Sequence, residues 1–384
     1  MAFLSLLRSI RSSLKSFKHV SDSGSHPSVN HKRKGGGRRV QRANEFNEDE
    51  SEGGFDARSL CLVVEKLEFV VELVYLNRFP DCLKSLIQSV VEIPVSLLEL
   101  GGYEKLNVLC SGILIKLLRG EHGDVMSTAA EVLKSLVPLI LMGKCQARSF
   151  ALGFLMNGVM GVSKESDGVR KAVVNLPKYL VNKAPEKAEL RGLAVEAIME
   201  IVKAMELEDQ MGFVEYTVKL TKGKANLRLV AVDLILMLMT SMRDPLGVEL
   251  DCEDSHSWGL SCLEALIERC SDSSAVIRAR ALSNLAQLVG FLSSDDRNRV
   301  ILKKLLKFGD GQMNDLLKKR CMDEKAIVKK AALLLVSKLI GLFDGSVDGI
   351  LLKTIGMSCS DPLVSIRKAA ISALSEVSLL FSFM

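Results

Sequence analysis

Apolar and polar residues follow each other with the period of an amphipathic helix along most of this chain. From Ala57 onward, aliphatic positions recur at intervals of three to four residues, and short polar breaks separate the runs. No stretch shows the sustained two-residue alternation of a half-buried strand. The eight prolines are also few for an all-β protein, which needs a turn about every ten residues. The pattern therefore predicts an all-α protein built from many short helices.

The helical region repeats itself. Three segments, which begin at Cys270, Cys321 and Cys359, align without gaps. Each has an Asp, then a basic residue, an Ala and an aliphatic residue at constant offsets. The inner part of this pattern occurs six times, as Arg148/Ala151/Leu155, Arg191/Ala194/Ile198, Arg228/Ala231/Ile235, Arg278/Ala281/Leu285, Lys329/Ala332/Val336 and Arg367/Ala370/Leu374. The mean spacing is about 44 residues, which is the length of a two-helix HEAT unit. We therefore expect a HEAT/armadillo-type right-handed α-solenoid over residues 58–384.

The residue types suggest a structural role for each repeated position. An Asp before a helix accepts hydrogen bonds from the unpaired backbone N–H groups of its first turn, so we expect N-caps at the start of each second helix. The basic residue, which we place two turns into that helix, can reach the Asp of its own or an adjacent repeat. The small Ala lets two helices approach closely. The structural repeat positions are Asp272, Arg278, Asp323, Lys329, Asp361 and Arg367.

The two longest spacings between repeats indicate insertions. Asp244 to Trp258 reads as an acidic loop, and Ser293 to Arg299 reads as a second break in the helical pattern. Loops on one face of a solenoid often contact its partners, so we expect these segments at a partner-facing edge.

The first 57 residues differ from the rest of the chain. Residues 1–44 hold ten Lys/Arg and one acid, a net charge of +9, which leaves −4 for the remaining residues of a chain whose formal charge is +5. Residues 21–57 offer little apolar surface to offset the entropy of ordering, so we predict a disordered basic and acidic tail over residues 1–57. We interpret its basic block first as a nuclear import signal and second as a phosphate-binding segment. The candidate residues are Lys32, Arg33, Lys34, Arg38, Arg39 and Arg42.

The first twenty residues leave two interpretations open. Phe3, Leu7, Ile10, Leu14 and Phe17 fall at helical spacing among basic residues and serines. Such a segment resembles an organelle transit peptide or a surface-binding amphipathic helix. The alternative is a fraying helix or a disordered segment.

A second basic region lies inside the predicted solenoid. Arg297 to Lys330 carries eleven Lys/Arg against four acids, a net charge of +7. It is either an ordinary exposed helix face or a surface that binds DNA phosphates. The candidates are Lys303, Lys304, Lys307, Lys318, Lys319 and Arg320.

The sequence contains few features of an enzyme or of a metal-binding protein. It contains no P-loop and no nucleophile elbow, and its nine cysteines form no C-x-x-C pair. His122 and His256 read as solvated loop residues, and the cysteines read as buried reduced thiols. No apolar run reaches the roughly 20 residues of a membrane span. We therefore expect a protein that is not an enzyme, with no cofactor, metal, small-molecule substrate or membrane contact.

Four segments carry a more specific resemblance: 77–88, 121–124, 129–141 and 262–286, the last with the sequence CLEALIERCSDSSAVIRARALSNLA. Together they resemble the D-type HEAT-repeat subunit of condensin II in a plant-like form. That resemblance implies a non-ATPase regulatory subunit that binds the kleisin and the SMC ATPases and helps compact mitotic chromosomes. It also implies a nuclear, chromosome-associated protein that contacts histones or DNA without sequence specificity. Family members are much longer, so we expect an N-terminal portion or a truncated form.

The sequence leaves two other functions open. One is a general HEAT-repeat adaptor in transport or phosphatase assembly without a chromatin role. The other is an organelle-targeted helical protein that uses the segment Met1–Val20 for targeting.

Overall fold

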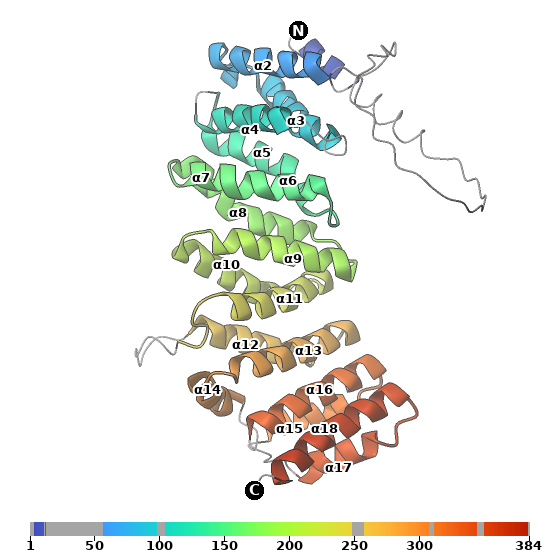
Figure 1. Ribbon diagram of the computed structural model, residues 1–384. Coiled ribbons are helices and arrows are strands. Elements are labelled where there is room, and N and C mark those ends of the chain that lie inside the picture. Colours follow the sequence, from blue (N-terminus) through green and yellow to red (C-terminus); the bar gives the residue numbers. More distant parts are fainter. Residues whose placement is uncertain are drawn as a thin grey trace, which may run out of the picture. The chain divides into compact units, whose positions relative to one another are not determined.

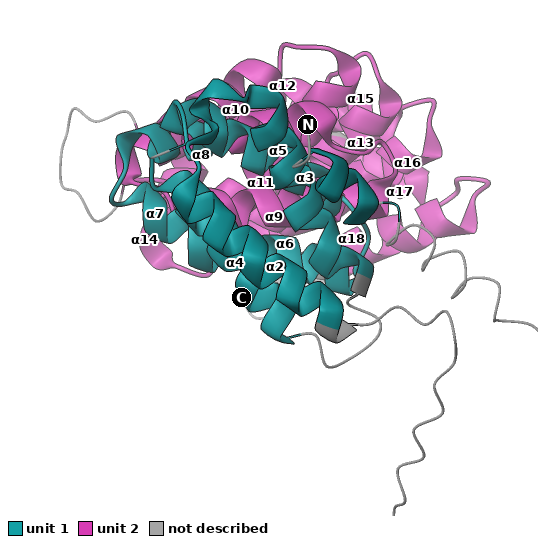
Figure 2. Cartoon of the chain, turned by 90° about the horizontal axis from the view of Figure 1, so that it is seen from above, with its two compact units in different colours: residues 1–173 teal, residues 174–384 magenta. Residues whose placement is uncertain are grey.

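The computed structural model describes residues 4–10, 12, 57–97, 104–120, 122–247, 257–306, 311–343 and 349–382. Within these ranges every regular element is helical and no strand occurs, so the predicted all-α, HEAT/armadillo-type fold class is confirmed (Figure 1). The chain forms two compact units, residues 1–173 and residues 174–384, which Figure 2 colours separately. The division into a tail and a repeat region at residue 57 stays a prediction.

Unit 1 is a stack of helices that are consecutive in the sequence. α2 packs against α4, α3 packs against both α4 and α5, and α5 packs against α6. The last helix of the stack contains one π-helical turn, η3, between α6 and α7. The bounds are α2 Ala57–Leu73, η1 Leu76–Arg78, α3 Pro80–Leu97, α4 Glu104–Leu118, α5 Val125–Ile140, α6 Gln146–Phe154, η3 Leu155–Val159 and α7 Met160–Ser163.

Residues 4–10, which we placed in the predicted disordered tail, are helical. Leu7 and Ile10, two positions of the predicted apolar stripe, are buried within the protein. Part of the apolar face of this short helix is therefore covered by the chain itself. Residues 13–56, which include the rest of the predicted tail, lie outside the described residues.

Unit 2 is built from helix pairs arranged in two layers. The second helices of the pairs, α9, α11, α13, α16 and α18, pack side by side in that order. The first helices lie behind them, with α10 against α12 and α15 against α17. The bounds are α8 Asp167–Lys183, which crosses into this unit, α9 Ala188–Lys203, α10 Leu207–Leu220, α11 Ala225–Ser241, α12 Trp258–Arg269, α13 Ala275–Leu292, α14 Asp296–Leu306, α15 Gln312–Cys321, α16 Ala326–Leu342, α17 Gly349–Ser358 and α18 Val364–Ser382.

The repeated alanines all lie within helices, Ala151 on α6 of unit 1 and the other five on the second helices of unit 2. All six are fully buried: Ala151, Ala194, Ala231, Ala281, Ala332 and Ala370. A methyl group there leaves room for the neighbouring helix, whereas a larger side chain would push the two backbones apart. The prediction that these six positions are buried is confirmed.

The two predicted insertions turn out differently. The break at Ser293–Arg299 is not a loop, because the extra helix α14 begins at Asp296 and packs against α13. The turn after α11 is held by Gly259, whose N–H donates to the carbonyl oxygen of Pro245 at 3.0 Å. A Cβ at Gly259 would lie 2.1 Å from that oxygen, so only glycine permits the approach. Residues 248–256 of the predicted acidic loop lie outside the described residues.

Candidate functional site

The repeated acidic and basic residues form a ladder that links consecutive repeats of unit 2. Arg228 of α11 donates from Nε to Asp272 Oδ2 at 2.8 Å and from Nη2 to Oδ1 at 3.0 Å. Arg278 of α13 contacts Asp323 in the same two-pronged way, at 3.1 and 3.0 Å. Lys329 Nζ lies 2.8 Å from Asp361 Oδ2 and continues the series. Each basic residue therefore pairs with the Asp of the next repeat, which is one of the two possibilities the spacing allowed.

The arginines of this ladder also close the turn of their own repeat. Arg228 Nη1 donates to the carbonyl oxygen of Gly223 at 2.9 Å, and Arg278 Nη1 donates to that of Asp272 at 2.9 Å. Arg367 Nη1 does the same with Asp361 at 2.8 Å. Arg228 and Arg278 therefore each hold the loop of one repeat and the carboxylate of the next, and this geometry fixes the register between neighbouring repeats.

The prediction that the three aspartates are N-caps is wrong. Asp272, Asp323 and Asp361 each stand three residues before the first helical residue, and α13 is preceded directly by Ser274 instead. Their Oδ1 atoms accept the N–H of the residue two positions on, at 2.8 to 3.1 Å, which is an Asx turn. This turn leaves the carboxylate facing the preceding repeat.

The position that we assigned to the basic residues is also wrong. Arg278, Lys329 and Arg367 are each the fourth residue of their helix, in its first turn and not two turns into it. Because the Asx turn places each helix start three residues after the Asp, the basic residue lies close enough to contact its own loop as well as the next repeat.

Burial and pairing act in opposite directions on the ladder carboxylates. Burial by itself raises the pKa of Asp272 and of Asp323. The hydrogen bonds and charges of the arginines, together with the backbone N–H of each Asx turn, outweigh burial and hold both pKa values below the usual one. The pKa of Asp361 is lowered chiefly by its hydrogen bond with Lys329. All three carboxylates are therefore charged at neutral pH.

The ion pair that links α9 to α11 differs from the other pairs of the ladder. Arg191 Nε donates to Asp233 Oδ2 at 3.0 Å, and Arg280 Nε donates to the other oxygen of the same carboxylate. Asp233 is buried in the middle of α11 and does not precede a helix. Sequence reasoning missed this pair, although a lone acid in the apolar run LVAVDLILMLM is a usable signal, because a buried charge needs partners.

Fewer cations of the predicted solenoid basic patch are exposed in the structure than the sequence suggested. Arg320 is buried and donates to Asp323 at 2.9 Å, so the prediction that it contacts DNA phosphates is wrong. It lies three residues before that Asp, and the turn therefore brings it into the ladder. Lys318 is half-buried beside Asp315, at 3.6 Å.

The remaining candidates of the patch are divided between two helices. Lys303 and Lys304 lie on α14, while Lys319 lies on α15; Lys304 and Lys319 are exposed and Lys303 is half-buried. Lys307 lies outside the described residues, as do the six candidates of the tail, Lys32, Arg33, Lys34, Arg38, Arg39 and Arg42.

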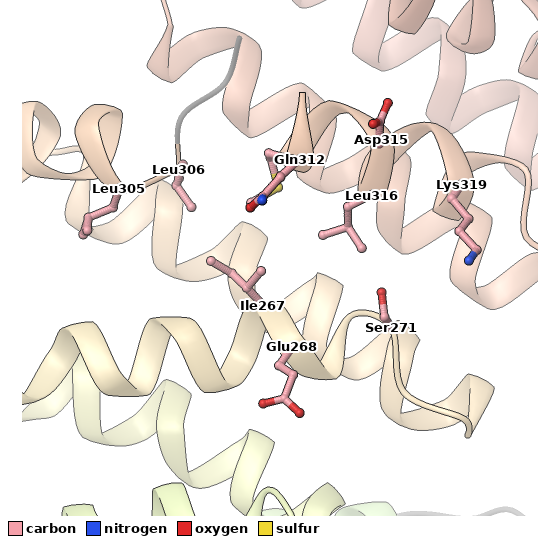
Figure 3. Close-up of a pocket in the computed structure, with 10 residues that line it drawn as sticks. Ile267, Glu268, Ser271, Leu305, Leu306, Gln312, Asp315, Leu316 and Lys319 are labelled. Carbon is pink, nitrogen blue, oxygen red and sulfur yellow. The ribbon is translucent and has the colours of Figure 1, made fainter. Parts of the chain in front are cut away.

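An open groove separates α12 from α14 and α15 (Figure 3). Its volume is about 770 Å³, and its apolar lining includes Ile267, Leu305 and Leu316. Glu268 and Lys319 add opposite charges to it. Its described lining residues include the carboxylates of Glu268 and Asp315 but no histidine or cysteine.

The described residues offer little reactive chemistry elsewhere. Burial raises the pKa of the Cys110, Cys262, Cys270 and Cys321 thiols to about 12, so these cysteines are protonated and unreactive at neutral pH. No group of His, Cys, Asp and Glu side chains in the described ranges could hold a metal ion. No described helix is both long and apolar enough to cross a membrane.

The interpretation of His122 as a solvated residue is wrong, because its side chain is only 5% exposed. The following residue, Gly123, has a φ of +137° and lies near Asn77, so the turn folds the histidine against the start of α3. Cys252 and His256 lie outside the described residues.

Comparison with known proteins gives two relatives. The chain is 54% identical over 390 residues to the condensin-2 complex subunit CAP-D3 of Arabidopsis thaliana, an alignment that covers 98% of this chain and 30% of the relative. It is 22% identical over 328 residues to the condensin-2 complex subunit D3-L of Xenopus laevis, with 67% of this chain and 22% of the relative covered. The chain thus spans less than a third of the length of either relative. No family model matches it.

Solved structures with a similar arrangement of helices are distant. UNC-45 from Drosophila melanogaster gives a TM-score of 0.41 at 11% identity, over 100% of this chain and 46% of that protein. A designed armadillo repeat protein in complex with a (KR)4 peptide gives 0.36 at 17% identity, over 64% and 99%. Scores this low add nothing to the fold class that the stacked helix pairs establish.

The alignment with the Arabidopsis relative extends over 98% of this chain, including the repeat region from which the ladder is built. The resemblance to the D-type HEAT-repeat subunit of condensin II is therefore confirmed along 98% of the chain, which corresponds to 30% of that plant subunit.

Proposed function

We propose that this chain acts as a non-catalytic scaffold within a condensin-type complex that compacts chromosomes in mitosis. The observation that carries the proposal is its 54% identity to the Arabidopsis condensin-2 subunit along almost its whole length. Because the chain spans 30% of that relative, the proposal concerns the contribution of this region. Its partners in the proposal are the kleisin, the SMC ATPases and chromatin.

The ladder supports a scaffolding role. A binding platform must keep its repeats in fixed register, since a partner that contacts several repeats gains affinity only when their spacing is constant. Partly buried pairs such as Arg278–Asp323 connect one repeat to the next and resist sliding between them. Such charged side chains hold structure together and are not placed to act on a substrate.

Co-purification from dividing plant cells tests this function. The full chain carries an affinity tag, and bound proteins are identified by mass spectrometry. We expect SMC ATPases and a kleisin among the enriched proteins. Enrichment of transport or phosphatase components without them would instead favour the general HEAT-adaptor function and contradict the proposal.

The proposal also places the chain in the nucleus, with import directed by the basic block of the tail. Replacement of Lys32, Arg33, Lys34, Arg38 and Arg39 by Ala should leave a fluorescent fusion in the cytoplasm, because import receptors recognise clustered positive charge. Nuclear accumulation that is unchanged by these substitutions would show that the tail is not the import signal.

A further inference from the structure

The second helices at the end of unit 2 share one solvent-exposed side, which we call the α13–α16–α18 face. α13 packs against α16 and α16 packs against α18, so their outer surfaces are continuous (Figure 1). Three aliphatic side chains are exposed there, Val276 at 55%, Ile327 at 54% and Leu334 at 44%. Three exposed lysines accompany them: Lys330, Lys338 and Lys368.

Repeat register places these residues in rows across the face. Val276 and Ile327 both stand two positions before the ladder residue of their helix. Lys330 and Lys368 both stand one position after it. The face therefore carries two rows of two residues each, at the spacing of neighbouring helices: the aliphatic Val276 and Ile327 on α13 and α16, and the ammonium groups of Lys330 and Lys368 on α16 and α18.

Lys338 extends the positive charge toward α13. A Cβ at Gly290 of α13 would lie 3.8 Å from Lys338 Cδ and 3.9 Å from its Cε. The lysine stem therefore lies across the glycine of the neighbouring helix, and its ammonium group stays in solvent.

The helices contribute little negative charge to this face, and the nearest described acid, the exposed Glu324, stands in the turn before α16. Neither α13 nor α16 contains an acidic residue, and the only acid of α18 is Glu376, whose side chain lies outside the described residues. Among the described residues, Lys330, Lys338 and Lys368 form no ion pair, whereas Lys329 beside them is engaged in the ladder. The corresponding side of α9 is instead acidic, with Glu189, Glu196 and Glu200 exposed.

We propose that the α13–α16–α18 face binds an acidic amphipathic segment of a partner protein, with carboxylates on the three lysines and apolar side chains on Val276, Ile327 and Leu334. Opposite charge steers and orients such a segment, and the aliphatic row supplies apolar burial. A nucleic acid would use the lysines, because its phosphates gain nothing from aliphatic groups. The exposed aromatic ring of α13, Phe291, is a single side chain outside both rows, whereas single-stranded nucleic acid stacks successive bases on several rings. The inference does not depend on which assembly the chain joins.

Fluorescence anisotropy with the full chain tests the proposal. The probe is a labelled helical peptide of about 18 residues with Leu along one side and Glu on the other, and the comparison peptide has Lys in place of each Glu. We expect the acidic peptide to bind at least about tenfold more tightly than its lysine counterpart. Equal binding of the two peptides would overturn the proposal.

Two sets of substitutions locate the binding. Lys330→Glu, Lys338→Glu and Lys368→Glu together should weaken the acidic peptide at least about tenfold, whereas Lys203→Glu, Lys222→Glu and Lys304→Glu, an equal change of charge on other exposed positions, should change its affinity less than about twofold. Similar losses in both sets would mean non-specific attraction and would overturn the proposal.

The pair Ile327→Ser and Leu334→Ser separates a protein partner from nucleic acid. We expect it to weaken the acidic peptide about fivefold or more, because apolar burial is lost. Binding that is lost only with the lysines and is displaced by duplex DNA would identify a phosphate-binding face and would also overturn the proposal. Circular dichroism of each variant establishes that the helices are intact.

Discussion

Single carboxylates connect the repeats of unit 2. Asp323 accepts two bonds from Arg278 of the preceding repeat, one from Arg320 of its own helix pair and one from the N–H of Lys325. Its side chain is 5% exposed, so removal of the negative charge leaves two arginines with little water to replace it. Loss of one partner at such a site therefore destabilises the fold far more than loss of one partner of an exposed ion pair.

We expect Asp323→Asn to lower the free energy of unfolding by about 2 kcal/mol or more, because the amide keeps the shape but not the charge that both arginines need. The matched control is Asp315→Asn, whose carboxylate is 78% exposed and lies 3.6 Å from Lys318. It should change stability by less than about 0.5 kcal/mol. Urea unfolding measures both variants, and equal effects would show that the ladder does not stabilise the repeats.

The same carboxylates predict a pH dependence. The pKa values of Asp272 and Asp323 are lower in the folded protein than their usual value of 3.8, so the unfolded chain binds more protons near that pH. Their contribution is fully present above about pH 5 and is lost as pH falls through the folded pKa values. The stability difference between the wild type and Asp323→Asn should therefore shrink below about pH 4. Thermal midpoints from pH 3 to 7 test this, and a difference that grows on acidification would contradict it.

At the scale of helices, close packing of the second helices depends on small residues. α13 packs against α11 on one side and α16 on the other, and its Ala281 is fully buried. The corresponding Ala332 of α16 is buried in the same way. A side chain larger than alanine at these positions would force the helices apart and would disturb the ladder geometry that depends on their spacing.

We expect Ala281→Leu to destabilise the protein by about 1–3 kcal/mol through overpacking. Ala279→Leu is the control on the same helix, where the side chain is half-exposed, and it should change stability by less than about 0.5 kcal/mol. Thermal unfolding followed by the helical circular dichroism signal compares them. If Ala281→Leu lowered stability no more than the control does, α13 would not be packed closely against α11 and α16, and the result would contradict this account of the helix packing.

Much of the fold was predictable from the sequence, because helical periodicity and the spacing of the repeated Ala report local and nearest-neighbour contacts. The site was only partly predictable. The spacing could not show that Asp323 forms an Asx turn, since the helix start depends on the turn geometry. Nor could the net charge of residues 297–330 show that Arg320 is buried, because a sum of charges does not distinguish a cation paired with a ladder carboxylate from one in solvent. The helix α14 was mistaken for a break because its sequence is largely polar.

At the scale of the whole chain, charge is distributed unevenly. The first 44 residues carry a net charge of +9, and the remainder carries −4. Since Arg320 belongs to the ladder, the +7 region from Arg297 to Lys330 offers fewer accessible cations than its composition suggests. We therefore infer that any DNA binding by this chain is driven by phosphates and carried mainly by the tail.

Substitution of Lys32, Arg33, Lys34, Arg38, Arg39 and Arg42 by Gln tests this inference without removal of the helix at residues 4–10, whose Leu7 and Ile10 are buried. We expect the variant to lose most of its affinity for duplex DNA at low salt and to show a much shallower salt dependence. The comparison variant carries Gln at Lys304 and Lys319, the exposed lysines of α14 and α15, and should retain wild-type binding. The reverse result would assign DNA contact to the repeats.

We propose that this chain is a binding region of a condensin-type assembly, and calorimetric titration of the purified chain with a purified condensin II kleisin tests that role most directly. We predict saturable one-to-one binding with a dissociation constant of about 1 μM or tighter, unchanged by ATP. Absence of binding at kleisin concentrations of about 100 μM, with the chain folded by circular dichroism, would contradict the claim.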